Sequence, residues 1–290
     1  MSSATITPTP PSLNERQRAA LISLLADDDP NVYQTVRTKI LSYGPVVTEW
    51  LQPYRLSSDP VLRRRAQEII HRLLRQAADE AFLAFCHNKG EDLDVEEASW
   101  LLAKTCYPET NVAAYQALFD NYAGELREQI QAADDPERIL VTINHYLFNK
   151  LGFFGNEKNY YDPDNGYLNR VVDRRTGIPI SLSMAYLFVT RRLHLPVTGI
   201  GLPLHFICRY QTARTEIYID PFRQGKFLTK ADCIKYLLEM NHGLQEGYLA
   251  PVSPRRMLLR MCSNLHQIYS HLKQADESAR LQRYLVALAK

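Results

Sequence analysis

The sequence predicts an α+β fold that is mostly helical, with a small antiparallel sheet in its C-terminal half. Apolar residues recur at helical spacing through residues 13–151 and again through 255–289. Residues 181–192 predict a helix that is apolar on nearly every side, which is typical of a buried helix. Short β-prone runs follow this helix, at 197–201, 205–210 and 215–220. We therefore expect the chain to be organised around residues 174–221.

Composition excludes several classes of protein. The chain has 290 residues, enough for about two domains, and its 46% hydrophobic and 23% charged residues are ordinary for a globular protein. A net charge of +2 gives no reason to expect a nucleic-acid or membrane partner, and no apolar run is long enough to span a bilayer. The five cysteines are odd in number and lack C-x-x-C spacing, which favours reduced thiols in the cytoplasm.

The N-terminal part predicts helical hairpins. Residues 1–12 have the composition of a disordered tail rather than of a secretory signal. An Asp-Pro pair recurs at Pro30 and Pro60, and each predicts the start of a helix. The offset between the two copies resembles that of HEAT repeats. Two copies are too few for an independent solenoid, so we expect residues 13–90 to form a HEAT-like cap docked on the following helices.

A loop follows the helices predicted over 111–131 and 137–151. Residues 152–166, GFFGNEKNYYDPDNG, break the helical pattern and predict a structured loop. Because such loops often carry binding residues, five side chains are pocket candidates: Asn156, Tyr160, Tyr161, Asp162 and Asn165. The alternative is that Asp162 and Asn165 cap the next helix, 167–173, which Gly177 would then end.

The two longer β-prone runs predict a hairpin. With a loop at 211–214, Arg209 lies opposite Glu216 and His205 opposite Asp220. Because side chains alternate along a strand, this register places His205 and Asp220 on one face and Cys208 on the other, which we expect to be the core face. We therefore expect a hydrogen bond between His205 and Asp220, and an inert core thiol at Cys208.

These features resemble a known core. A small residue at the start of a buried helix, a strand with His and a strand that ends in Asp-Pro resemble the transglutaminase-like core of the papain-type thiol enzymes. In that core Cys attacks an amide, His is its base and Asp orients the His, and this chain order maps onto Ser181, His205 and Asp220. The strings FFGNEKNYYDPDNGYLNRVVDRRTGIPISLSMAYL and GLPLHFICRY are similar to the bacterial SirB-type family, over residues 92–290. The resemblance implies a transglutaminase-like domain at 91–250 and a tetratricopeptide-like helical hairpin at 251–290.

The chain departs from the thiol enzymes at the nucleophile. Ser181 stands where they have Cys, and a hydroxyl is a much poorer nucleophile than a thiolate. A Ser at a helix start also has a structural role open to it as a capping residue. If the site of a thiol ancestor survives, Ser181→Cys should produce a reactive thiol.

Three functions therefore stay open. The first is a non-catalytic, regulatory or protein-binding module with a protein partner, which the flanking helical hairpins favour. The second is a serine-dependent amidase, acyl-transferase or protease-like hydrolase that uses Ser181, His205 and Asp220, and labelling by a serine probe would separate it from the first. A peptidase that uses a cysteine elsewhere is the weakest. No metal-ligand spacing or phosphate-binding loop occurs, so we expect no cofactor and no metal, while the oligomeric state stays open.

Overall fold

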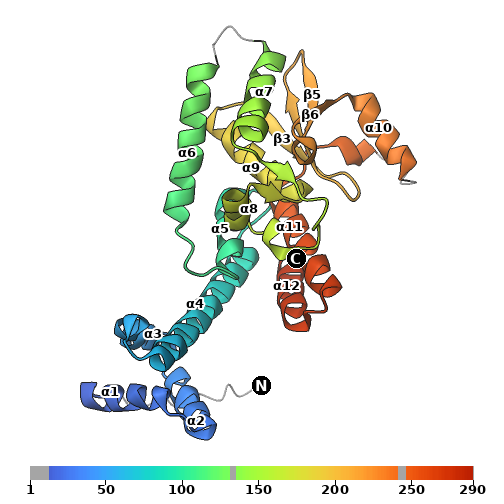
Figure 1. The fold of residues 1–290 in the computed structure, drawn as a ribbon. Helices are drawn as coiled ribbons and strands as arrows, with labels where there is room; N and C mark the ends of the chain where they lie inside the picture. Colours follow the sequence, from blue (N-terminus) through green and yellow to red (C-terminus); the bar gives the residue numbers. More distant parts are fainter. Residues whose placement is uncertain (1–12, 131–134, 241–245, 290) are drawn as a thin grey trace. The chain divides into compact units, whose positions relative to one another are not determined.

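The computed structural model describes residues 13–130, 135–240 and 246–289, which divide into two compact units. One unit comprises the residues up to Ala81 together with Lys104–Glu109, and the other comprises Phe82–Ala103 and the chain from Thr110 onward. Figure 1 shows the elements of both in chain order. The predicted tail at 1–12 lies outside the described residues. Within the described part, none of the helices combines the length and the apolar character that a membrane-spanning helix needs.

The first unit is helical, as predicted. Asp29 accepts a hydrogen bond from the Asn31 amide, and Asp59 accepts one from the Val61 amide, so each Asp-Pro pair begins a helix. The packed core of the unit includes Leu25, Ile40, Leu51 and Ile69. Its elements are α1 (Glu15–Ser23), η1 (Leu24–Ala26), α2 (Pro30–Leu41), η2 (Gly44–Val46), α3 (Val47–Leu51), η3 (Gln52–Leu56) and the first part of α4 (Pro60–Asn88).

The second unit is built around one buried helix, α9 (Pro179–Arg192). Every residue of α9 from Pro179 to Thr190 is buried, as its all-round apolar pattern predicts. The other helices of this unit are α5 (Val95–Lys104), α6 (Val112–Gln129), α7 (Pro136–Asn144), the π-helix η4 (His145–Lys150), η5 (Pro163–Asn165), α8 (Leu168–Arg174), η6 (Pro221–Arg223), α10 (Lys230–Glu239), η7 (Glu246–Leu249), α11 (Pro254–His271) and α12 (Ala275–Leu288).

A four-stranded antiparallel sheet lies beside α9, with the strand order β3-β4-β5-β6. Its strands are β3 (Val197–Ile200), β4 (Ile207–Gln211), β5 (Glu216–Asp220) and β6 (Lys226–Leu228). The predicted register was wrong by two residues, because Arg209 pairs with Tyr218 and Gln211 with Glu216. The turn is closed one residue later than expected, by a hydrogen bond from the Thr212 amide to the Thr215 carbonyl. A slip of two residues leaves every side chain on its predicted face, because the period of a strand is two.

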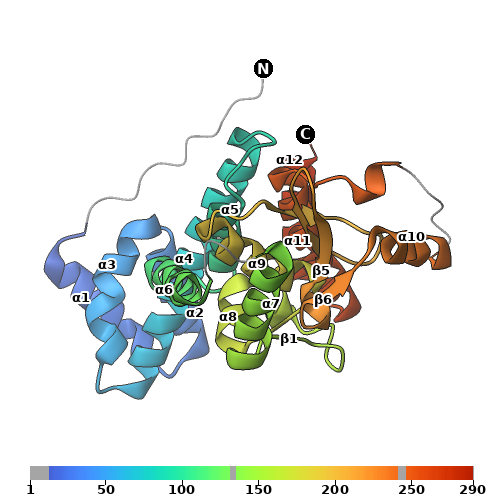
Figure 2. The same ribbon diagram turned by 90° about the horizontal axis from the view of Figure 1, so that it is seen from above.

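Both faces of this sheet are buried, so the expectation of a single core face was wrong. On one face the Cys208 thiol approaches the Ser183 carbonyl of α9 at 3.9 Å. On the other face Ile207 and Tyr218 pack with Cys233 and Leu237 of α10. Figure 2 shows α10 beyond β5 and β6 as seen from α9. The sheet is therefore the middle layer of three, which explains why the His205 side of the hairpin is also shielded.

A second, two-stranded parallel pair joins the loop to the start of α9. Phe154 of β1 (Phe154–Gly155) pairs with Thr176 of β2 (Thr176–Gly177). The residue that ends α8 in the left-handed conformation is Arg175, with φ 56°, and not Gly177 as expected. Gly177 serves a close approach instead, because a Cβ there would lie 2.6 Å from the Ser181 hydroxyl.

The C-terminal helices α11 and α12 form an antiparallel hairpin that packs against the rest of the second unit (Figure 1). The Tyr269 hydroxyl lies 3.1 Å from the hydroxyl of Tyr167, next to α8, and the Arg255 guanidinium donates to the carbonyls of Cys86 and Leu288. The hairpin thus covers its apolar face with the rest of its own unit, one of the two outcomes that its single-hairpin length predicts.

Candidate functional site

The His205–Asp220 pair forms as predicted. His205 precedes β4 in a turn in which its amide donates to the Leu202 carbonyl, and Asp220 is the last residue of β5. The His205 Nε2 atom lies 2.8 Å from Asp220 Oδ2, although the residue paired with Asp220 in the sheet is on β6, Lys226. The reach of the His205 side chain along the same face makes up for the difference of two residues in register.

The Asp220 carboxylate is buried, with 1% of its side chain exposed, and its second oxygen is also occupied. Asp220 Oδ1 accepts hydrogen bonds from the backbone amides of Phe222 and Arg223 at 3.1 and 3.3 Å, so the side chain also caps the short helix η6. When Asp220 is ionised and the imidazole is neutral, Nε2 of His205 carries the proton between them, because an ionised carboxylate only accepts hydrogen bonds, and Nδ1 is left as an acceptor. This is the tautomer that a general base would need.

Aromatic rings surround the pair. The Phe222 and Tyr236 rings lie 6.0 and 6.1 Å from the imidazole of His205, and Tyr236 donates from its hydroxyl to the Pro203 carbonyl. His205 and Asp220 line a cavity of about 370 Å³, whose lining also includes cations of η6, β6 and α10 (Arg223, Lys226 and Lys235) and the α10 carboxylates Asp232 and Glu239. Burial raises the pKa of the Tyr236 hydroxyl and keeps it protonated.

Ser181 lies at the start of α9, as predicted, but its hydroxyl is committed elsewhere. The side chain is fully buried, and Oγ donates to the Asn165 carbonyl at 2.6 Å and accepts from the Ile178 amide at 3.1 Å. A hydroxyl has one proton, and the shortest contact places that proton on the loop carbonyl. Among the described residues, its partners are the backbone groups of Asn165 and Ile178, and His205 is not one of them. The structure therefore brings together two of the three candidate catalytic residues.

The two Asn candidates hold the loop closed against α9. Asn165 is fully buried, and its amide donates to the carbonyls of Asn159 and Tyr160 at 2.8 and 3.2 Å. The Asn156 amide donates in turn to Asn165 Oδ1 at 3.0 Å. These bonds satisfy buried polar groups within the loop, so both side chains are positioning groups here.

Asp162 is engaged by neighbouring structure as well. Its carboxylate accepts from the Asp164 amide and pairs with Arg174 at 2.7 Å. Capping was expected for α8, but Asp162 caps the 3₁₀ helix η5, and α8 begins after Tyr167 without a side-chain cap. The sequence did not predict η5, which lies between the loop and α8 and is the helix that Asp162 caps.

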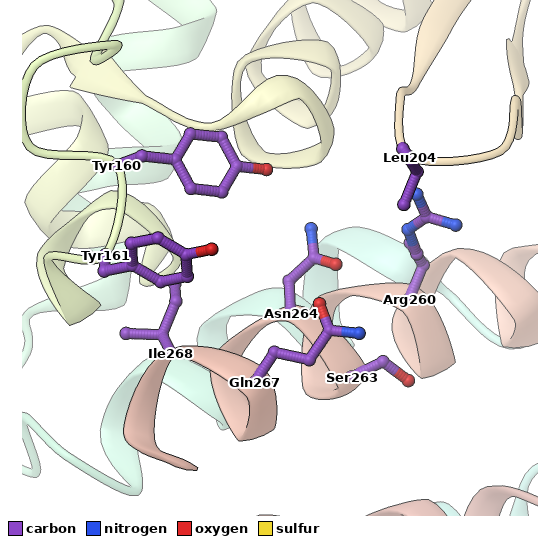
Figure 3. A pocket seen from close by; sticks show the side chains of 8 residues that line it. All are labelled: Tyr160, Tyr161, Leu204, Arg260, Ser263, Asn264, Gln267 and Ile268. Carbon is purple, nitrogen blue, oxygen red and sulfur yellow. The ribbon is translucent and has the colours of Figure 1, made fainter. Parts of the chain in front are cut away.

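The two Tyr candidates line a cavity of about 440 Å³ (Figure 3). Tyr160 and Tyr161 project from the loop on one side, Leu204 lies across from them, and α11 supplies the rest of the lining. Burial raises the pKa of Tyr160, and the Tyr161 ring stacks on His271 with centroids 3.9 Å apart. The α11 side chains in the cavity are Arg260, Ser263, Asn264, Gln267 and Ile268.

Sequence reasoning missed the α11 side of this cavity. Arg260, Asn264 and Gln267 recur at helical spacing, and such a polar stripe predicts a solvent-facing side of an amphipathic helix. Only the folded loop shows that Tyr160 and Tyr161 stand beside it. A run of polar residues that includes two amides and only one charge is the signal that could have drawn attention to it.

Side chains of these types can serve as metal ligands, as nucleophiles or as a base. Within the described part of the chain, no three His, Cys, Asp or Glu side chains gather closely enough to hold a metal ion. Cys208 is fully buried, as expected, and burial raises the pKa of its thiol, so it is a poor nucleophile. The pair His205–Asp220 can accept a proton, but the Ser181 hydroxyl that a base would activate donates to the Asn165 carbonyl instead.

Comparisons with known proteins support the transglutaminase-like fold of the second unit. Residues 113–263 match the model of the transglutaminase-like superfamily. The chain is 33% identical over 197 residues to a UPF0162 protein of Xylella fastidiosa (strain 9a5c), over 66% of this chain and 70% of that relative. It is 23% identical to a UPF0162 protein of Vibrio cholerae over 71% of this chain and 69% of that relative. F-box only protein 21 of Mus musculus is 36% identical over 49% of this chain and 23% of its own length. No solved structure matches the chain significantly.

Proposed function

The chain belongs to the transglutaminase-like superfamily, together with the UPF0162 proteins, and from this premise we propose that it is a non-catalytic module that binds polypeptide. One observation carries the proposal. The hydroxyl at the nucleophile position, on Ser181, is fully buried and donates to the Asn165 carbonyl at 2.6 Å. A group that holds a loop in this way has neither the base nor the access that nucleophilic catalysis requires.

The shape of the unit supports binding. The cavity beside Tyr160 and Tyr161 presents apolar rings and side-chain amides, a combination that suits a polypeptide. In F-box only protein 21 the matched region is 23% of the length, which supports its use as a module within larger proteins. We assign the N-terminal helices as a HEAT-like cap and α11–α12 as a tetratricopeptide-like hairpin, within a SirB-type protein. The five free cysteines favour a reducing compartment, and we place the protein in the cytoplasm.

A fluorophosphonate probe tests the proposal. We expect the native protein to stay unlabelled at Ser181, and Ser181→Ala to give the same labelling pattern as wild type. Stoichiometric labelling of Ser181 that is lost in His205→Ala would overturn the proposal. A folded control is needed, so the unfolding midpoint of each variant is measured beside its labelling.

The second candidate, a serine-dependent amidase or acyl-transferase, is favoured by the 2.8 Å contact between His205 and Asp220. In this mechanism His205 would take the proton of Ser181 while Asp220 holds the imidazole. The hydroxyl would first have to leave the Asn165 carbonyl. Amide hydrolysis by the wild type that disappears in both Ser181→Ala and Asp220→Asn would establish it.

A further inference from the structure

The cavity between the loop and α11 contains a cation that lacks a counter-charge. Of the eight described residues that line it, Arg260 is the one cation and none is acidic. Among the described residues no carboxylate forms an ion pair with Arg260, and its hydrogen bond is a long one of 3.5 Å to the Leu202 carbonyl. Burial lowers the pKa of Arg260, with the nearby hydroxyls of Tyr160 and Tyr236 acting in the opposite direction. A guanidinium that is partly drawn out of water without a carboxylate partner favours the binding of an anion.

The rest of the lining fits a peptide rather than a small inorganic anion. The side-chain amides of Asn264 and Gln267 have no hydrogen bond to any other described group, and each offers both a donor and an acceptor, as a peptide group does. Phosphate sites in contrast draw on several backbone N–H groups or several cations, and this cavity has one. Tyr160 and Tyr161 supply ring faces for apolar side chains (Figure 3).

The rim carries a second sign of binding. Leu204 faces the cavity from the turn before His205, and it is 72% exposed with a φ of 60°. A bulky residue in the left-handed region is strained, and such strain gathers at binding sites. An exposed Leu at this place would be covered by a ligand that lies across the cavity.

We propose that this cavity binds an extended peptide segment whose Glu or Asp side chain pairs with Arg260, while Asn264 and Gln267 hold its backbone. The inference rests on the proposed binding function and names the chemistry of the partner. A bidentate guanidinium–carboxylate pair in a partly desolvated site gives both affinity and orientation.

Titration calorimetry with three probes tests it: an acetylated and amidated pentapeptide with a central Glu, the same peptide with a central Gln, and inorganic phosphate. We expect the Glu peptide to bind the full-length protein about tenfold more tightly than the Gln peptide, in line with a charge-assisted pair. Arg260→Gln should bring this ratio to about one, and Asn264→Ala should weaken both peptides alike. Arg256→Gln is the matched control, because Arg256 is an exposed Arg one turn earlier on α11 that does not line this cavity.

Any of three results would overturn the inference. The two peptides could bind equally, phosphate could bind as tightly as the Glu peptide, or the ratio of Glu-peptide to Gln-peptide affinity could be unchanged in Arg260→Gln. If Arg260→Gln does not fold, Arg260→Lys replaces it, and the loss of the planar fork should still reduce the ratio. The proposed function fails separately, because labelling of Ser181 would refute the non-catalytic assignment whatever the Glu-to-Gln ratio is.

Discussion

Replacing Ser181 by Ala tests whether this residue is structural. The change removes the 2.6 Å donor to the Asn165 carbonyl and the 3.1 Å acceptor of the Ile178 amide, both within the buried start of α9. A buried polar group that loses its partner costs about 1–3 kcal/mol. The Ile178 amide keeps a longer contact of 3.4 Å with the Asn165 carbonyl, which softens the loss. We therefore expect the free energy of unfolding to fall by about 2 kcal/mol.

Ser183 provides the matched control. It lies two residues further along α9 and is equally buried, but its hydroxyl makes one long hydrogen bond, 3.4 Å, to the Phe206 carbonyl. Ser183→Ala should therefore cost less than about 1 kcal/mol. The comparison removes the general effect of a Ser-to-Ala change in a buried helix, such as the higher helix propensity of Ala.

Urea unfolding of the full chain gives the answer, with the transition of the second unit followed by the fluorescence of Trp100 in a Trp50→Phe background, because Trp50 lies in the first unit. At about 2 kcal/mol, the melting temperature of a unit of this size should fall by roughly 4–8 °C. The loop at 156–165 should also exchange its amide hydrogens faster, because Asn165 loses its tie to α9. A Ser181→Ala midpoint equal to that of wild type, or equal costs for the two variants, would refute the reasoning.

Three further changes have defined outcomes. Ser181→Cys should react with iodoacetamide as slowly as the buried wild-type thiols, because full burial raises the pKa of a thiol. This is the reverse of what the sequence alone predicted. Rapid alkylation of the folded variant would contradict it. Glu96→Gln should lower the free energy of unfolding by about 1–3 kcal/mol, since it removes the buried carboxylate that Arg192 contacts at 2.8 Å and leaves Arg192 only its more exposed partner, Asp120. Thermal melting equal to that of wild type would count against this. Gly225→Ala should destabilise by at least about 1 kcal/mol, because Gly225 has φ +74° and a Cβ there would lie 2.4 Å from Asn144; chemical denaturation measures this, and an unchanged midpoint would disprove it.

The sequence was sufficient for most helices because burial repeats with the helical period. The Asp-Pro starts at Pro30 and Pro60, and the buried helix at 179–192, follow from local chemistry and periodicity. The β1–β2 pair was missed because each strand has two residues, too few to show any alternation. The register of β4 and β5 was mispredicted because no residue type in this segment distinguishes a turn at 211–214 from one at 212–215.

The candidate site shows the same difference between local contacts, which the sequence predicts, and distant contacts, which it does not. His205 and Asp220 could be paired from the sequence because both are carried by one hairpin, a local structure. The bonding of Ser181 could not be predicted, because it depends on where a loop sixteen positions earlier places the Asn165 carbonyl. The α11 cavity was missed for a similar reason. Polar residues at helical spacing look solvent-facing until a distant loop is packed beside them.

The hydrogen bond between His205 and Asp220, and the bonding of the Ser181 hydroxyl to the Asn165 carbonyl, can both be explained without catalysis. Asp220 would be needed even without a reaction, because its carboxylate caps η6 through two backbone amides and is buried behind the sheet. A buried carboxylate with backbone partners still gains from a third donor, and His205 Nε2 provides it at 2.8 Å. The imidazole in turn packs near the rings of Phe222 and Tyr236. The pair is thus accounted for by the packing of the sheet edge, and the Ser181 hydroxyl by the closure of the loop, so the geometry of these three residues can be explained without a reaction.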